Sequence, residues 1–184
     1  NAVSGEMAGQ CHIGVVVKPT FQCNACCEYC NVGHDPLRMD RKMIDALFRG
    51  LASLLDREPD HDMTVLWHGG EPLVMGGRFY EYVLKAERNT LGGRARQVMQ
   101  TNLTLATDEL VQILDEFLND RGIGTSLDPF TNYRRLKGDA SYLTAWYEGF
   151  ERVKARGLRV GVVYVAHRES VGRAADLYYY LKNV

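Results

Sequence analysis

Four of the five cysteines lie within one stretch of eight residues, and three of them have the spacing of metal ligands. Cys23, Cys27 and Cys30 are separated by three and then by two intervening residues. Thiolates so close together hold metal, and a cubane iron–sulfur cluster normally takes four cysteines. Three ligands from this loop would leave one iron free to bind a substrate. Cys26 offers a second frame, Cys23-Cys26-Cys30, in which the two spacings are reversed.

The cysteine usage fits a metal site better than disulfides. A disulfide framework uses separated pairs in an oxidising compartment, whereas thiols clustered in a reducing compartment are typical of metal ligands. Cys11 begins an apolar run and is expected to be a small buried residue. A non-enzymatic zinc module, with the same thiols and His34, is an alternative of another class. Structural zinc loops, however, usually come as two separated pairs.

Further polar motifs follow along the chain. Gly69 and Gly70 have no side chains and Pro72 stiffens the exit, so backbone carbonyls in this segment can accept hydrogen bonds from an ammonium group. A second cluster spans residues 100–102. In a third, 126–128, the alternation of a strand places the serine and the aspartate on one face.

The apolar pattern predicts the elements that hold these motifs. Runs of strand character alternate with segments of helical period, which is typical of parallel strands joined by crossover helices. The fold class is therefore α/β, a partial (β/α)6-type TIM barrel with five β/α units. In such barrels reactive groups gather at the C-terminal ends of the strands, where every motif above falls. The predicted strands are Ile13 to Lys18, Met63 to His68, Gln97 to Thr101, Ile123 to Leu127 and Arg159 to Ala166.

Apolar stripes predict the helices. The first helix is expected to begin near Asp40 and to carry Met43, Leu47, Leu51 and Leu54 on one face. A later helix should start at Thr107 and stop at Gly122, another should carry a stripe from Leu143 to Val153, and the last should span Val171 to Lys182.

Composition limits the class of protein. The chain has 184 residues, 46% hydrophobic and 24% charged, with a formal net charge of −1. These values suit one soluble domain, and they argue against the basic surface of a nucleic-acid-binding protein. Without an apolar run of about 18 residues or the pattern of a signal peptide, the chain is expected to be cytoplasmic, with no membrane partner.

With Asn24 after its first cysteine and Tyr29 before its last, the cysteine loop resembles the signature of the radical S-adenosylmethionine enzymes. The later motifs agree in order with that family, and only the frame with Cys27 puts both residues in their usual places. The resemblance implies a [4Fe-4S] cluster on Cys23, Cys27 and Cys30 and S-adenosylmethionine on its open iron. Reductive cleavage would then give a 5'-deoxyadenosyl radical, which takes a hydrogen atom from the substrate.

The resemblance also assigns the cofactor contacts. They are Tyr29, Gly69, Gly70, Glu71, Pro72, Thr101, Asn102, Ser126 and Arg135. Two departures from the family pattern stand out. Leu103 replaces the glycine that usually follows Gln-Thr-Asn, and the loop after Asp128 looks shortened. Arg135 is chosen as the guanidinium clamp for a carboxylate because its spacing to Gly138 and Ser141 preserves the later pattern.

The motif combination most resembles the branch that modifies peptides and proteins. It implies a peptide or protein substrate and an electron donor such as flavodoxin or ferredoxin. A maturase of ribosomally made peptides, forming a crosslink or a related product, is the first expectation, and an anaerobic sulfatase-maturing enzyme is the second. Because barrels of this family usually have six strands, residues 1–184 are expected to be a core domain of a longer enzyme, without a C-terminal auxiliary-cluster region.

Overall fold

The computed structural model describes residues 12–33, 35–119 and 122–183 as a parallel sheet flanked by helices. Cys11 and His34 lie outside these ranges. The strands, in sheet order, are β1 (His12–Val17), β2 (Asp62–Trp67), β3 (Ala95–Thr101), β4 (Gly122–Ser126) and β5 (Arg159–Val163). The helices are α1 (Arg41–Arg57), α2 (Gly77–Thr90), α3 (Asp108–Phe117), α4 (Tyr142–Ala155) and α5 (Ala174–Lys182), with 3-10 turns η1 (Pro72–Met75) and η2 (Val171–Arg173).

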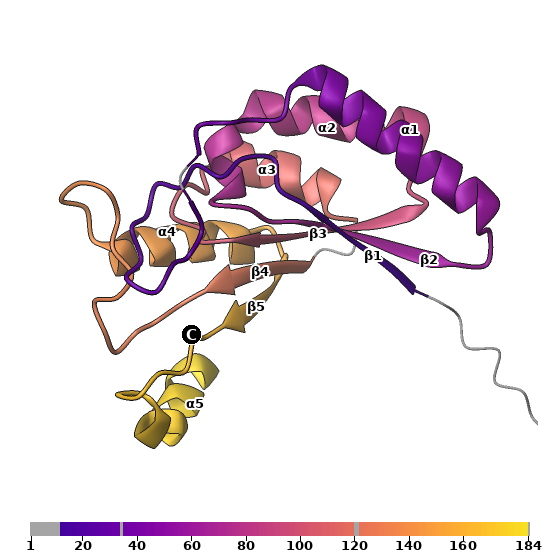
Figure 1. Cartoon of the computed structure of the whole chain (residues 1–184). Helices are drawn as coiled ribbons and strands as arrows, with labels where there is room; N and C mark the ends of the chain where they lie inside the picture. The colour runs from indigo at the N-terminus through magenta and orange to yellow at the C-terminus, as the bar shows by residue number, and fades with distance from the viewer. Residues whose placement is uncertain (1–11, 34, 120–121, 184) are drawn as a thin grey trace, which may run out of the picture.

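The sheet topology confirms the expected fold class. All four strand pairings are parallel and the spatial order equals the chain order, so each crossover helix packs beside the previous one. Helices α1, α2 and α3 lie over one face of the sheet (Figure 1). The result is an open, partial barrel in which all the C-terminal strand ends share one edge. None of the described helices is long and apolar enough to cross a membrane.

The core lies between the sheet and its helices. Trp67 on β2 is completely buried, and its ring contacts Phe48 of α1, Tyr80 of α2 and Phe117 of α3 with centroids 5.5 to 6.4 Å apart. Its indole N–H donates to Gln97 Oε1 at 2.9 Å. One aromatic residue therefore joins three helices to the strand that leads into the Gly-Gly-Glu-Pro motif.

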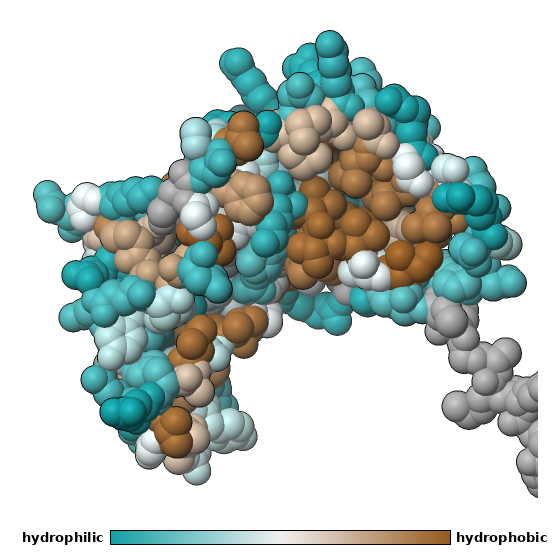
Figure 2. All heavy atoms as spheres, viewed as in Figure 1, coloured by the Kyte–Doolittle hydropathy of each residue, from teal (hydrophilic) through white to brown (hydrophobic). Residues whose placement is uncertain are grey.

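The buried face of α1 differs from the prediction by about one residue. The helix begins after Asp40, as expected, and the Asp40 carboxylate accepts a hydrogen bond from Met43 N at 2.8 Å. However, Ile44 and Phe48 are fully buried, whereas Met43 is 51% exposed. The apolar stripe is wider than one face, so its centre could not be located by periodicity alone. In Figure 2 apolar side chains gather on the side of the molecule between α1 and β1.

Other element boundaries shift by a few residues. Helix α3 ends at Phe117 instead of Gly122, and its cap residue Leu118 is fully buried. Strand β5 ends at Val163, three residues before the predicted end at Ala166. Strand β3 begins at Ala95, two residues earlier than expected, because its first residues pair in parallel with β2. These differences leave the positions of the polar motifs at the strand ends unchanged.

Candidate functional site

The predicted motifs meet at one cavity of about 250 Å³ at the C-terminal ends of β1, β2, β3 and β4. Of the residues predicted from the sequence, those that line it are Cys23, Cys27, Cys30, Tyr29, Gly69, Gly70, Glu71, Thr101, Asn102 and Ser126. Pro72 and Arg135 are not among the lining residues. His68, Gln100 and Arg134 line the cavity as well, although none of them was assigned a cofactor contact from the sequence.

The cysteine loop is held in place by the segment that follows β4. Cys26 N donates to Arg135 O and Glu28 N donates to Tyr133 O, both at 2.8 Å, and Lys137 N donates to the backbone oxygen of Asn24 at 2.9 Å. These bonds make a short antiparallel pairing across about 110 residues of sequence. Backbone hydrogen bonds within the protein therefore hold the cysteine loop in position.

Cys23, Cys27 and Cys30 line the cavity, whereas the thiol of exposed Cys26 contacts Leu136 O at 3.8 Å. Burial raises the pKa of the Cys23 thiol to about 11, against a hydrogen bond from Ala25 N. Burial also raises the pKa of the Cys27 thiol, and the charge of Arg134 opposes this effect. When no metal ion is bound, both thiols thus favour the protonated form.

Gly69 and Gly70 are required by a close approach of the cysteine loop. A Cβ on Gly70 would lie 2.3 Å from Gln22 O and 2.4 Å from Phe21 O, and a Cβ on Gly69 would lie 2.4 Å from Thr20 O. Gly69 also has φ of +135°, which other residues rarely adopt. The two glycines are therefore needed so that the backbone leading into the cysteines can pass close to them. This requirement is separate from the predicted role of their carbonyls in binding a ligand.

Glu71 is buried and its carboxylate accepts three hydrogen bonds. Oε1 accepts from Leu73 N at 2.9 Å and from Thr101 Oγ1 at 2.6 Å, and Oε2 accepts from Asn102 N at 2.6 Å. Burial raises the pKa of Glu71 to about 7, although these three donors favour the ionised form. Because both of its oxygens accept from protein donors, the carboxylate links the loop that follows β2 to the end of β3.

The polar residues at the end of β3 also bind other parts of the site. Asn102 Nδ2 donates to Asn24 Oδ1 at 2.9 Å, and Asn24 Nδ2 donates to Thr104 Oγ1 at 2.7 Å. This chain of side chains connects the cysteine loop to β3. Leu103, which departs from the Gln-Thr-Asn-Gly pattern that this segment resembles, has φ of +60° and is fully buried. The backbone thus keeps the left-handed conformation that favours glycine at this position.

Ser126 and Asp128 have different surroundings. Ser126 lines the cavity, and its Oγ accepts a hydrogen bond from Gln100 Nε2 at 3.1 Å. The carboxylate of Asp128, 2% exposed, accepts from Thr131 Oγ1 at 2.7 Å and lies 3.9 Å from His167 Nε2. Strand alternation placed both residues on one face, but only Ser126 is among the residues that line the cavity, and Asp128 is not.

The cavity cation is Arg134, one residue before the predicted clamp. The Arg134 guanidinium carbon lies 5.1 Å from the ring centroid of Tyr29, and its Nη1 lies 3.9 Å from Cys27 Sγ. Its Nε is buried and has no hydrogen-bond partner among the described residues. Arg135 instead forms an ion pair with Glu28, and both side chains are about half exposed. A loop places consecutive residues on different sides, so sequence spacing could not separate the two arginines.

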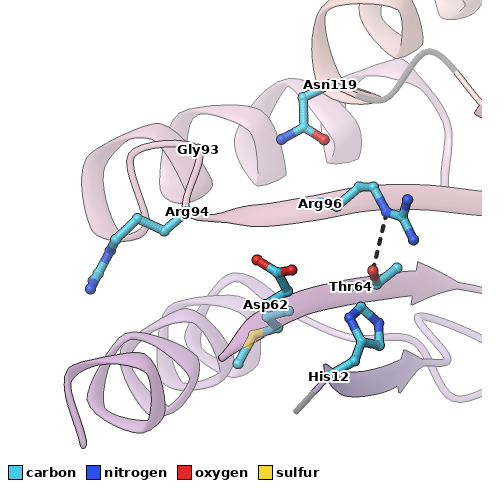
Figure 3. Close-up of a pocket in the computed structure, with 8 residues that line it drawn as sticks. His12, Asp62, Thr64, Gly93, Arg94, Arg96 and Asn119 are labelled. Carbon is cyan, nitrogen blue, oxygen red and sulfur yellow. Dashed lines mark hydrogen bonds between the residues drawn. The ribbon is translucent and has the colours of Figure 1, made fainter. Parts of the chain in front are cut away.

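A second cavity, of about 460 Å³, lies at the opposite ends of the strands (Figure 3). It is lined by polar residues of β1, β2 and β3, among them His12, Asp62 and Arg96, and the Arg96 guanidinium donates to Thr64 Oγ1 at 3.1 Å. Although this cavity is larger, it contains none of the site residues predicted from the sequence, most of which line the smaller cavity instead.

Comparison with known proteins decides the family. The family model described as Radical SAM superfamily matches residues 17–177. The chain belongs to the radical SAM superfamily. An uncharacterised protein of Methanothermobacter thermautotrophicus is 31% identical over 175 residues, which cover 92% of this chain and 63% of that protein. A serine-type anaerobic sulfatase-maturating enzyme of Bacteroides thetaiotaomicron is 26% identical over 184 residues, covering 92% of this chain and 43% of the enzyme.

A solved structure agrees with the fold. Native anSMEcpe with bound AdoMet and Cp18Cys peptide matches with a TM-score of 0.80 and 19% identity, over 94% of this chain and 48% of that one. The radical SAM chain described here thus spans about half the length of that structure and of the sulfatase-maturating relative. The resemblance inferred from the motifs is confirmed at the level of family and fold.

Membership of the radical SAM superfamily implies S-adenosylmethionine and an iron–sulfur cluster, and the donors of the cavity suit both groups. Three cysteines line the cavity, and the N–H of the buried Arg134 Nε is left to donate to a carboxylate oxygen. Among residues 12–33, 35–119 and 122–183, no three His, Cys, Asp or Glu side chains converge closely enough to hold a single metal ion. The three thiols therefore share a cavity without converging on one point.

Proposed function

We propose that this chain is the core of a radical SAM enzyme that modifies a peptide or protein substrate. One observation supports the proposal above the others: three cysteines, the residues Gly69 to Glu71, a serine and an arginine come from four separate segments to a single cavity. A structural metal loop would need only its ligands. The additional polar groups at neighbouring strand ends favour a site that also binds a small molecule.

The residues have distinct proposed roles. Cys23, Cys27 and Cys30 hold a [4Fe-4S] cluster, and Cys26 does not, because its thiol lies outside the cavity. Arg134 binds the carboxylate of S-adenosylmethionine and replaces Arg135 in that role. When bound, the cluster and S-adenosylmethionine supply reductive cleavage of the sulfonium and hydrogen-atom abstraction from an unactivated carbon.

Several other residues position this cavity. Backbone atoms of Gly69 and Gly70 line it and are held against the cysteine loop, so they can meet the methionyl amine. The hydrogen bond between Glu71 and Thr101 fixes the turn that follows β2 against the end of β3. Tyr29, whose ring packs edge-on against Tyr133 at 6.5 Å, packs against the adenine of S-adenosylmethionine in this proposal and restricts the access of water.

A ribosomal peptide maturase that forms a crosslink is the first candidate, and serine-type sulfatase maturation, which gives formylglycine, is the second. The second candidate is supported by similarity to serine-type anaerobic sulfatase-maturating enzymes of Bacteroides thetaiotaomicron and Klebsiella pneumoniae, which are 26% and 28% identical to this chain. Either reaction needs a low-potential electron donor such as flavodoxin or ferredoxin, and the cytoplasm supplies both the reducing conditions and these carriers.

The test uses the full-length protein, reconstituted anaerobically with iron and sulfide. We expect about four iron atoms and four sulfides per cluster, and reductant-dependent cleavage of S-adenosylmethionine. Zinc alone, or iron that leaves S-adenosylmethionine intact, would contradict the proposal and favour a structural metal module. Peptides encoded near the gene and a sulfatase-derived serine peptide would then be compared as substrates. A product that reacts with a hydrazide identifies formylglycine, whereas a crosslinked product lacks the aldehyde and fragments as a ring.

A further inference from the structure

Gln100 and Ser126 form a hydrogen-bonded pair inside the cavity. Gln100 lies near the end of β3 and faces Gly124 of β4 in the parallel ladder. Its side chain extends along β4 to Ser126, two residues further on, where Nε2 donates to Oγ at 3.1 Å. Both residues line the cavity that holds the thiols. The pair therefore connects two neighbouring strands at the level of the proposed cofactor site.

The missing side chain at Gly124 makes this pair possible. A Cβ on Gly124 would lie 2.1 Å from Gln100 Oε1 and 3.1 Å from Gln100 Cδ. Gly161, its neighbour on β5 in the same row, has no heavy atom within 4 Å of the position of a Cβ. The two glycines thus differ: only the space beside Gly124 is filled by the amide of Gln100.

The direction of this hydrogen bond fixes the role of the serine hydroxyl. A hydroxyl carries one proton, and its oxygen accepts through two lone pairs. Because the Gln100 amide already donates to Ser126 Oγ, the hydroxyl proton has to point elsewhere. The backbone oxygen of Ser126 is engaged separately, since it accepts from the Tyr142 hydroxyl at 2.9 Å. The remaining direction for the proton is the cavity that Ser126 lines.

We propose that Gln100 is a positioning residue that sets the Ser126 hydroxyl as a donor to an acceptor oxygen of S-adenosylmethionine, and that Gly124 supplies the space for it. The inference deepens the proposed function and rests on it. The acceptor is either the methionyl carboxylate or a ribose hydroxyl, because both present oxygens that can accept.

The first test is a double-mutant cycle on the reconstituted full-length protein, with the dissociation constant of S-adenosylmethionine measured by equilibrium dialysis. Gln100→Glu keeps the size of the side chain but removes its donor, so the Ser126 proton should turn toward the new carboxylate. We expect binding to weaken by roughly tenfold or more, as for loss of one hydrogen bond to a charged or strongly polar group. In the Ser126→Ala background the same change should have no further effect.

The cycle separates positioning from simple charge repulsion. If Gln100→Glu weakens binding equally with and without the Ser126 hydroxyl, the new charge acts directly on the ligand and the inference fails. Unchanged binding in Gln100→Glu alone would also overturn it. Gln112→Glu, on the exposed surface of α3, is the matched control for a change of one charge and should bind as the parent does.

A second test leaves both side chains of the pair intact. Gly124→Ala should fold, because the atom it displaces is the end of a flexible side chain, but it should move the Gln100 amide away from Ser126. Its affinity for S-adenosylmethionine should fall toward that of Ser126→Ala, while Gly161→Ala should leave it unchanged. Equal affinities for the two glycine variants would contradict the role given to Gly124.

Two further readouts complete the design. Decarboxylated S-adenosylmethionine identifies the acceptor: a Gln100→Glu effect that disappears with this analogue supports the carboxylate, and one that persists supports the ribose. Electron paramagnetic resonance of the reduced cluster tests the proposed function by itself. A parent protein without a cluster, or without affinity for S-adenosylmethionine, refutes the proposed function, whereas a normal parent with an equally normal Gln100→Glu variant refutes only the positioning role.

Discussion

The buried carboxyl of Glu71 should make the metal-free protein less stable as the pH rises. Burial raises its pKa to about 7 in the folded state, compared with an ordinary value of 4.5. Between these two values the folded state binds more protons than the unfolded state, so stability falls with increasing pH and becomes constant above the folded pKa. From pH 5 to pH 8 this one group should lower the free energy of unfolding by about 2.5 kcal/mol.

Glu71→Gln removes this titration and keeps the shape of the side chain. At pH 5 the parent carries a protonated carboxyl, both of whose oxygens can accept, whereas an amide accepts through one oxygen only. Three donors converge at this position, from Leu73 N, Thr101 Oγ1 and Asn102 N. The variant should therefore be less stable than the parent at pH 5, by about 1–3 kcal/mol for a buried donor left without its acceptor. At pH 8 the difference should shrink or change sign, because the parent now carries a buried charge.

The assay is urea unfolding at several pH values, followed by the fluorescence of the two fully buried tryptophans, Trp67 and Trp146. Subtracting the curve of Glu71→Gln from that of the parent removes the titration of histidines and of surface carboxylates, which the two proteins share. A difference that stays constant from pH 5 to pH 8 would refute the reasoning. It would mean that the three donors keep Glu71 ionised throughout and outweigh the effect of burial.

Three further predictions concern the site and the core. Gly70→Ala would place a Cβ against two backbone oxygens of the cysteine loop, so it should lower stability by about 3 kcal/mol and reduce iron uptake on reconstitution, whereas Gly50→Ala on α1, where the space is open, should stabilise by about 1 kcal/mol. In an iron and sulfide assay, Cys27→Ala should lose the cluster and Cys26→Ala should keep it; the reverse result would select the other cysteine frame. Trp67→Phe should lower the urea midpoint, measured by circular dichroism, by the equivalent of about 2–4 kcal/mol, because it leaves a cavity and removes a buried hydrogen bond to Gln97; a midpoint equal to that of the parent would contradict this.

Much of the architecture could be predicted from the chain because it is encoded locally. Alternating strand and helix periods predicted five parallel β/α units, and the structure has them in chain order. The helix start at Asp40 was also readable, since a capping residue acts on the next turn. The buried face of α1 was not, because Met43 and Ile44 are both apolar and only packing decides between them.

Some residues of the candidate site could likewise be predicted from the sequence, and others could not. The sequence identified Cys23, Cys27 and Cys30 as ligands and Gly69 to Glu71 and Ser126 as contacts, and all of these residues line the cavity. Arg134 was missed in favour of its neighbour, because a loop of unknown conformation gives no signal for the direction of a side chain. Gln100 stood in a recognised motif, but its partner lies 26 residues away and is reached only through the register of β3 and β4.

The sequence by itself determined the family, the order of the elements and the set of chemical groups available at the strand ends. These depend on residue type and on spacing along one chain, which folding does not alter. The tertiary structure decided which groups face one another. Gly70 meets Phe21 and Gln22, and Glu71 meets Thr101 and Asn102, because strands far apart in sequence pair in one register. Such contacts depend on the packing of the whole sheet, and no local pattern contains them.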